Sequence, residues 1–322
     1  MSLTISCAFN GALNSHEHAA IADELGFKRA FFYDTPAIAA DVWIQLARAA
    51  ERTSKIMLGP GVMVPSLRHP MVTANAIATL ASIAGQDRVI VAVGAGFTGR
   101  ITMGQRPMKW QMIEEYLQAL QALLRGEEVM WEGALMKMMH HDAWAPPRPI
   151  KIPFLIAAEG PKGIAAAKKY ADGVIKVDGV LEDFDWNATI MSGTVLDDGE
   201  PLTSDHALRA GGPMAAVAMH MLLEFQDPTT LPNGVAWKAA YDAIPAERRH
   251  MAIHDGHAAL VNDVDRNFMT PEVLGLYGNA MDRAGWKEKL AEYEERGVTE
   301  LIFQPVDDVP RELDAFMNMV KS

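Results

Sequence analysis

Short apolar runs alternate with segments of helical spacing along most of this chain. The apolar runs are each too short for a helix. They lie at residues 4–9, 29–33, 56–58, 88–93, 154–157, 174–177, 189–196 and 300–303. Segments with helical spacing lie between and after them, at 15–25, 40–52, 71–84, 108–125, 163–170, 288–295 and 311–319. This alternation predicts an α/β fold with a parallel sheet.

Eight candidate strands favour a closed barrel over an open, doubly wound sheet. An open, doubly wound sheet usually has fewer strands, and no Gly-x-Gly-x-x-Gly follows the first run. We therefore expect a (β/α)8 TIM barrel. Two segments interrupt the alternation. Residues 126–152 carry a Trp-Glu-Gly turn and a proline cluster, which indicates an inserted hairpin or loop, and 200–283 is mostly helical by pattern. We treat 1–322 as a single domain with these two insertions.

Composition narrows the class of protein. Lys plus Arg is 29 and Asp plus Glu is 41, so the net charge is −12. This charge argues against nucleic-acid binding and against attachment to an anionic membrane, although a local basic pocket could still bind a phosphate. The one cysteine, Cys7, cannot form an intramolecular disulfide. With no apolar run long enough to span a bilayer and no signal-peptide pattern at the start, we expect a cytoplasmic protein.

The barrel topology directs the search for a site, because active sites in this fold lie at the carboxyl ends of the strands. Residues 58–70 follow the third run and contain Gly59-Pro60-Gly61, then Arg68 and His69. Residues 93–100 end the fourth run with Gly94, Ala95, Gly96 and Arg100. Glycines there would let a flat ligand approach the backbone. The alternative for residues 58–70 is an ordinary Gly/Pro turn with a solvated arginine.

The segment after the fifth run indicates an anion site. Gly160, Pro161, Lys162 and Gly163 lead into an alanine-rich helix. Free N–H groups at a helix start, with Lys162 beside them, would attract a phosphate, and Lys176 at the end of the next run offers a second cation. The alternative is a capped surface helix with a solvated lysine.

Histidines and one aspartate are the remaining candidates. His250, His254 and His257 have the spacing of one helix face, and His220 could join them. Because they lack an H-E-x-x-H pattern or nearby cysteines, we expect a polar pocket wall or surface histidines and no metal. Asp34 is the clearest carboxylate at a strand end, unless it only forms a cap or turn.

Three motifs, LGPGVMVPSLRHP at 58–70, GAGFTGR at 94–100 and AAEGPKG at 157–163, together resemble the bacterial luciferase-like superfamily. The resemblance covers nearly the whole chain. It is greatest to the branch of methylenetetrahydromethanopterin reductases that use the deazaflavin coenzyme F420. It implies a barrel whose mouth holds a flavin or deazaflavin ring, with a non-prolyl cis peptide at Gly61-Val62 behind the ring. The cofactor-binding residues it implies are Asp34, Gly61, Val62, Gly94, Ala95, Gly96, Arg100, Gly160, Pro161, Lys162, Gly163 and Lys176.

One position departs from the family pattern. Many of these F420 enzymes carry an Asp-His pair after the second strand, whereas Thr35 follows Asp34 here. A proton donor must then come from His69, His220, His254 or His257, and we take His69, His254 and Asp34 as the candidate catalytic residues.

The resemblance thus predicts an F420-dependent oxidoreductase that transfers hydride to or from a small organic substrate and forms a homodimer. The first alternative is an FMN-dependent luciferase-like monooxygenase that oxygenates an apolar molecule. A non-catalytic flavin-binding protein and a zinc hydrolase on a barrel are two further hypotheses.

Overall fold

Eight parallel strands form a nearly closed ring in the computed structural model, which describes residues 3–177 and 179–322. The strand order is β3-β2-β1-β12-β9-β8-β7-β4. Isolated bridges from Leu58 to Val89 and from Met63 to Val93 join the two end strands, β3 and β4. The predicted TIM barrel is confirmed.

The barrel strands follow the predicted apolar runs to within a few residues. They are β1 (Thr4–Phe9), β2 (Arg29–Phe32), β3 (Met57–Pro60), β4 (Val91–Val93), β7 (Phe154–Ala157), β8 (Gly173–Lys176), β9 (Asn187–Ser192) and β12 (Glu300–Gln304). The helices around them are α1 (Ser15–Leu25), α2 (Val42–Ala50), α3 (Pro70–Ala84), α4 (Phe97–Ile101), α5 (Trp110–Arg125), α6 (Pro161–Tyr170), α12 (Arg283–Glu295) and α13 (Val309–Lys321), with short 3-10 turns η1 (Pro65–Leu67) and η2 (Gln86–Arg88).

Alternate residues of the strands fill the barrel interior, because successive side chains of a strand point to opposite faces. The inner cluster contains Ala8, Phe31, Ile90, Ala92, Leu155, Ile175, Ala188 and Ile302. At the carboxyl ends of the strands, half-buried Tyr33, Val62, Ala157 and Ile190 pack on this cluster. They form the floor of the barrel mouth.

One predicted strand is wrong in extent. Residues 189–196 do not form a single strand: β9 ends at Ser192, and β10 (Thr194–Val195) pairs instead with β11 (Ala280–Met281) outside the barrel. The break falls at Gly193, where an added Cβ would lie 2.4 Å from the carbonyl oxygen of Asn279. The two short strands join the barrel to the helices that precede β11.

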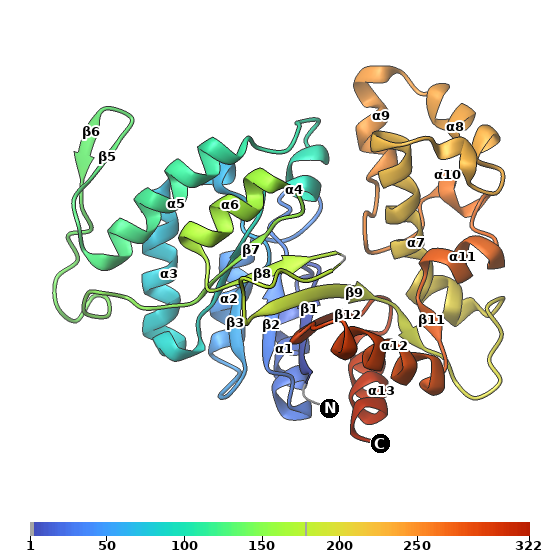
Figure 1. The fold of residues 1–322 in the computed structure, drawn as a ribbon, viewed down its shortest axis with the longest axis horizontal. Helices are drawn as coiled ribbons and strands as arrows, with labels where there is room; N and C mark the ends of the chain where they lie inside the picture. The colour runs from blue at the N-terminus through green and yellow to red at the C-terminus, as the bar shows by residue number, and fades with distance from the viewer. Residues whose placement is uncertain (1–2, 178) are drawn as a thin grey trace.

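Both interrupting segments contain regular secondary structure. Within 126–152, β5 (Val129–Trp131) and β6 (Ala134–Met136) form a hairpin that turns at Glu132 and Gly133, both with positive φ. Within 200–283 lie α7 (Asp205–Phe225), η3 (Pro228–Thr230), α8 (Gly234–Asp242), α9 (Ala246–Ile253), α10 (Asp263–Arg266) and α11 (Pro271–Tyr277). Figure 1 shows the hairpin at one end of the molecule and these helices, here called the helical insertion, at the other.

No helix among the described residues combines the length and the apolar character needed to cross a membrane.

Barrel closure depends on a glycine, which gives a first prediction. A Cβ on Gly59 of β3 would lie 1.8 Å from the carbonyl oxygen of Ile90, a backbone atom that cannot move without opening the β3–β4 contact. Gly59→Ala is expected to lower the free energy of unfolding by about 3 kcal/mol in urea denaturation. Gly275→Ala is the matched control, because its Cβ would meet only Leu202 at 3.5 Å inside α11, and it should be neutral or slightly stabilising. Equal stability of the two variants would show that β3 and β4 do not pack as described.

Candidate active site

The loop after β3 lies against its neighbours with no space for extra side chains. The peptide bond between Gly61 and Val62 is cis, as the family resemblance implied. A Cβ on Gly61 would lie 2.6 Å from the Phe31 ring, and a Cβ on Gly94 would lie 2.7 Å from the Val62 side chain. The backbone of β3, its loop and the end of β4 therefore meet where only glycine fits. This packing presents Val62 on the floor of the mouth.

Asp34 fixes this loop from the end of β2. Its buried carboxylate accepts a hydrogen bond from the Val64 N–H at 3.3 Å and two from Nη1 of Arg68 at 2.7 and 2.8 Å. Arg68 also contacts the exposed Asp41 at 3.2 Å. Burial raises the pKa of Asp34, and the hydrogen bonds and charge of Arg68 oppose that rise. Both side chains are thus engaged with each other, which gives Asp34 a positioning role.

The residues after β4 contact the loop after β3 and the segment that precedes α5. Gly96 has a positive φ at the start of α4, and a Cβ there would lie 2.5 Å from Val64. Arg100 donates to the Arg106 carbonyl and to the Ser66 hydroxyl, each at 2.6 Å. The Ala95 carbonyl accepts from the Met108 N–H at 2.8 Å. The guanidinium of Arg100 therefore connects the loops after β3 and β4.

A polar network crosses the opposite side of the mouth. Gln304 Oε1 accepts hydrogen bonds from the Tyr33 hydroxyl at 2.6 Å and the Ser192 hydroxyl at 2.8 Å. Asn10 donates to the carbonyl of Ala258, a residue of the helical insertion, at 3.0 Å. Burial raises the pKa of Tyr33, so its hydroxyl remains protonated. Through Ala258 the insertion is bonded to the barrel mouth.

The start of α6 is the segment for which the sequence predicts an anion site. Pro161 is the first helical residue, and the N-cap residue, Gly160, has no side chain that could accept a hydrogen bond from the first turn. Lys162 is exposed and makes no ion pair among the described residues. Lys176 is different, because its Nζ lies 2.9 Å from Oε2 of Glu159. The second cation expected there is therefore already paired.

The prediction that His250, His254 and His257 share one helix face is wrong. α9 ends at Ile253, and the chain turns through Gly256 and Ala258 with positive φ, so His250 does not share a face with His257. The histidines that meet are His220, His254 and His257, each at most 5% exposed.

The surroundings of this histidine cluster reach from the insertion to the barrel. Nδ1 atoms of His254 and His257 lie 3.0 Å apart, and Nε2 of His257 lies 3.3 Å from the Thr98 hydroxyl in α4. Burial, with His254 and His220 nearby, lowers the pKa of His257 to about 3, so it is neutral at physiological pH. Nε2 of His220 lies 2.7 Å from Oδ2 of Asp265. Asp265 was not among the residues proposed from sequence, since nothing local marks it.

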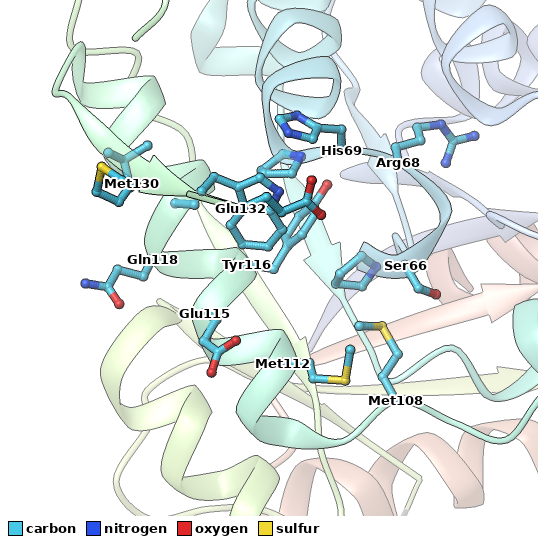
Figure 2. A pocket seen from close by; sticks show the side chains of 15 residues that line it. Ser66, Arg68, His69, Met108, Met112, Glu115, Tyr116, Gln118, Met130 and Glu132 are labelled. Atoms are coloured by element: carbon cyan, nitrogen blue, oxygen red, sulfur yellow. The ribbon is translucent and has the colours of Figure 1, made fainter. Parts of the chain in front are cut away.

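His69 lies elsewhere. It starts α3, its Nδ1 accepts from the Met71 N–H at 3.1 Å, and its ring packs edge-on against Trp131 of the hairpin. It lines an open groove of about 770 Å³ between α3, α5 and the hairpin. Figure 2 shows the side chains of His69 and Arg68 pointing in different directions. The structure therefore does not bring His69 to the histidine cluster.

Comparison with known proteins supports the assigned fold and shows the family to which the chain belongs. The family model described as luciferase-like monooxygenase matches residues 12–187. Among curated proteins, a 5,10-methylenetetrahydromethanopterin reductase of Archaeoglobus fulgidus is 32% identical over 139 residues, which cover 42% of this chain and 40% of that protein. An F420-dependent glucose-6-phosphate dehydrogenase of Beutenbergia cavernae is 31% identical over 182 residues, covering 50% of this chain and 52% of that protein.

A solved structure resembles the whole fold. The coenzyme F420 dependent tetrahydromethanopterin reductase from Methanopyrus kandleri superposes with a TM-score of 0.67 at 20% identity, covering 98% of both chains. At this identity the likeness bears on the fold alone. In sequence, the chain spans only about half the length of the curated relatives it matches.

The role of Asp34 can be tested by removing its charge. Asp34→Asn leaves the Arg68 guanidinium half-buried without its main partner, and is expected to lower the free energy of unfolding by about 2–3 kcal/mol in urea. Asp41→Asn is the control. Asp41 contacts the same arginine from an exposed position, and asparagine caps α2 as well as aspartate does, so the loss should stay below about 1 kcal/mol. If the two variants lose the same stability, the loop is not held by Asp34.

Proposed function

Since the chain belongs to the luciferase-like monooxygenase family, we propose that it is an F420-dependent oxidoreductase acting on a small organic molecule. The observation that carries this proposal is an apolar barrel mouth on the same side of the barrel as a helix start whose Lys162 makes no ion pair within the described part of the chain. A flat ring and a phosphate of one cofactor need these two features together.

The mouth fits a planar ring. Val62, Ala157 and Ile190 expose apolar surface on its floor. The cis peptide at 61–62 lies beside them, and Gly94 brings a further stretch of backbone to Val62. At the end of β2, the buried hydroxyl of Thr35 has no hydrogen-bond partner in the described part of the chain, and a polar group of a ligand could supply one.

The start of α6 fits the phosphate of such a cofactor. The N–H groups of residues 162 and 163 are in the first turn, where a helix offers donors and a partial positive charge. Lys162 adds a full charge, whereas Lys176 contributes less because Glu159 neutralises it. Gly163 allows Trp110 to pack against this turn, since a Cβ would lie 2.5 Å from its ring. Trp110 thus keeps the first turn of α6 in place.

When bound, the deazaflavin supplies hydride transfer, and the chain supplies binding and orientation. Asp34 and Arg68 keep the loop behind the ring fixed. The helical insertion, bonded to Asn10 through Ala258, covers one side of the mouth and would limit access of water. We propose that the substrate binds beside Thr98 and His257, which places His254 and His257 near it and leaves His69 outside.

F420 is favoured over FMN by the sequence relatives. Those at 30% identity or more include methylenetetrahydromethanopterin reductases and an F420-dependent dehydrogenase, whereas proteins called monooxygenases appear among structures of lower identity. The FMN-dependent monooxygenase is therefore the alternative that a binding experiment must exclude.

A homodimer remains part of the proposal. Ile44 of α2, Val72 of α3, and Met130 and Leu135 of the hairpin are each more than half exposed apolar side chains. Such residues are candidates for an interface between two copies.

The cofactor assignment is tested by titrating the protein with F420 and with FMN, following quenching of cofactor fluorescence. We expect saturable binding of F420 with a Kd at least tenfold lower than that for FMN. Lys162→Glu should raise the Kd for F420 about tenfold, because the phosphate loses a cation and meets a carboxylate (about 1.4 kcal/mol).

Lys168→Glu is the matched control, with the same charge change on the same helix. Lys168 is paired with Asp183, lies one turn or more from the helix start, and its replacement should leave the Kd within about twofold. Tight FMN binding with weak F420 binding refutes the cofactor assignment. Equal effects of the two lysine variants on the Kd for F420 would refute the phosphate site. The choice between F420 and FMN would then still be decided by comparing their Kd values for the unmodified protein.

A further inference from the structure

Three buried imidazoles converge where the helical insertion meets the barrel. His220 comes from α7, His254 follows α9, and His257 lies in the turn beyond it. One ligand atom from each can be chosen so that all three lie within 4.8 Å of one another. Three nitrogens around a tetrahedral Zn²⁺, at about 2.0–2.1 Å each, lie about 3.4 Å apart. Small side-chain rotations would bring the cluster to that spacing.

The carboxylate of Asp265 orients one of these rings. His220 Nε2 lies 2.7 Å from Asp265 Oδ2, while its Nδ1 is buried and has no hydrogen-bond partner in the described part of the chain. Asp265 is fully buried and is itself held by Trp237 Nε1 at 2.9 Å and the Tyr241 hydroxyl at 2.8 Å. A histidine that donates one ring N–H to a carboxylate and keeps the other nitrogen available is the usual arrangement of a metal ligand.

The charge balance of the cluster favours a cation. Asp265 lies in ion-pair contact with His220 and has no Lys or Arg partner among the described residues. The hydrogen bonds from Trp237 and Tyr241 are from neutral groups. A divalent cation bound beside Asp265 would compensate the negative charge of its buried carboxylate. Imidazole nitrogens can bind such an ion without adding charge of their own.

From this geometry we propose that His220, His254 and His257 bind a divalent transition ion of the zinc type, with Asp265 as the group that orients His220. Three protein ligands leave a fourth position. The Thr98 hydroxyl, 3.3 Å from His257, lies on the barrel side of the cluster. This site goes beyond the proposed hydride transfer, which needs no metal, and it differs from the expectation from sequence that no metal is bound.

The experiment uses untagged protein stripped with a chelator and titrated with Co²⁺ and Zn²⁺. We expect one ion per chain by mass spectrometry of metals, a visible absorption of tetrahedral Co²⁺, and a higher Tm with Zn²⁺. Because the readouts are stoichiometry, absorption and Tm, the result does not depend on F420 binding or activity.

Variants locate the ion. His257→Gln should abolish the Co²⁺ absorption and weaken Zn²⁺ binding at least 100-fold, and Asp265→Asn should weaken it about 10–100-fold while leaving one ion at saturation. His141→Gln, at an exposed histidine, is the control and should bind as the original protein does. Circular dichroism establishes that each variant is folded.

Two results overturn the proposal. Folded original protein that binds neither ion at micromolar concentration excludes the site, whatever the variants do. Binding that is as tight in folded His257→Gln as in His141→Gln places the metal elsewhere.

Discussion

The structure of the mouth depends on one constraint, the close approach of the β3 loop to its neighbours. Gly59 lies against the backbone of Ile90, Gly61 against Phe31, and Gly94 against Val62. Side chains at these positions would separate the strands. The same contacts expose the apolar face of Val62 and align the loop whose Arg68 binds Asp34. Barrel closure and the shape of the candidate site therefore have a single cause.

The helical insertion is connected to this mouth by polar contacts. Ala258 accepts from Asn10, and His257 contacts Thr98, so the turn after α9 lies on the end of β1 and on α4. Behind this turn, Asp265 ties α10 to α7 and α8 through His220, Trp237 and Tyr241. This buried network holds the helices of the insertion together, and the contacts to Asn10 and Thr98 connect them to the barrel. Both are required if the insertion is to contribute groups to a substrate.

Much of the fold could be predicted because local sequence patterns determine its helices and strands. Helix ends at Gly26 and Gly126 have the left-handed conformation that glycine favours, and α1 spans the predicted residues 15–25. The strand ends were placed well enough to identify the mouth. The break at Gly193 was missed because its cause is Asn279, far along the chain.

The candidate site was less predictable, because its residues also come together from distant parts of the chain. Helical spacing grouped His250 with His254 and His257, but the helix ends at Ile253 and the third member comes from α7. Asp265 is 45 residues from His220 and carries no motif. Asp34 is predicted from its strand end, yet its role as the partner of Arg68 depends on a contact between the loops that follow the neighbouring strands β2 and β3.

The most direct measurement of the central claim is a crystal structure of the protein with F420. The account predicts the ring against the Gly61–Val62 peptide, on the floor formed with Ala157 and Ile190, and the phosphate within hydrogen-bond distance of the N–H groups at the start of α6. A ring bound outside the mouth, such as in the groove between α3 and α5, or a phosphate remote from α6, would contradict it.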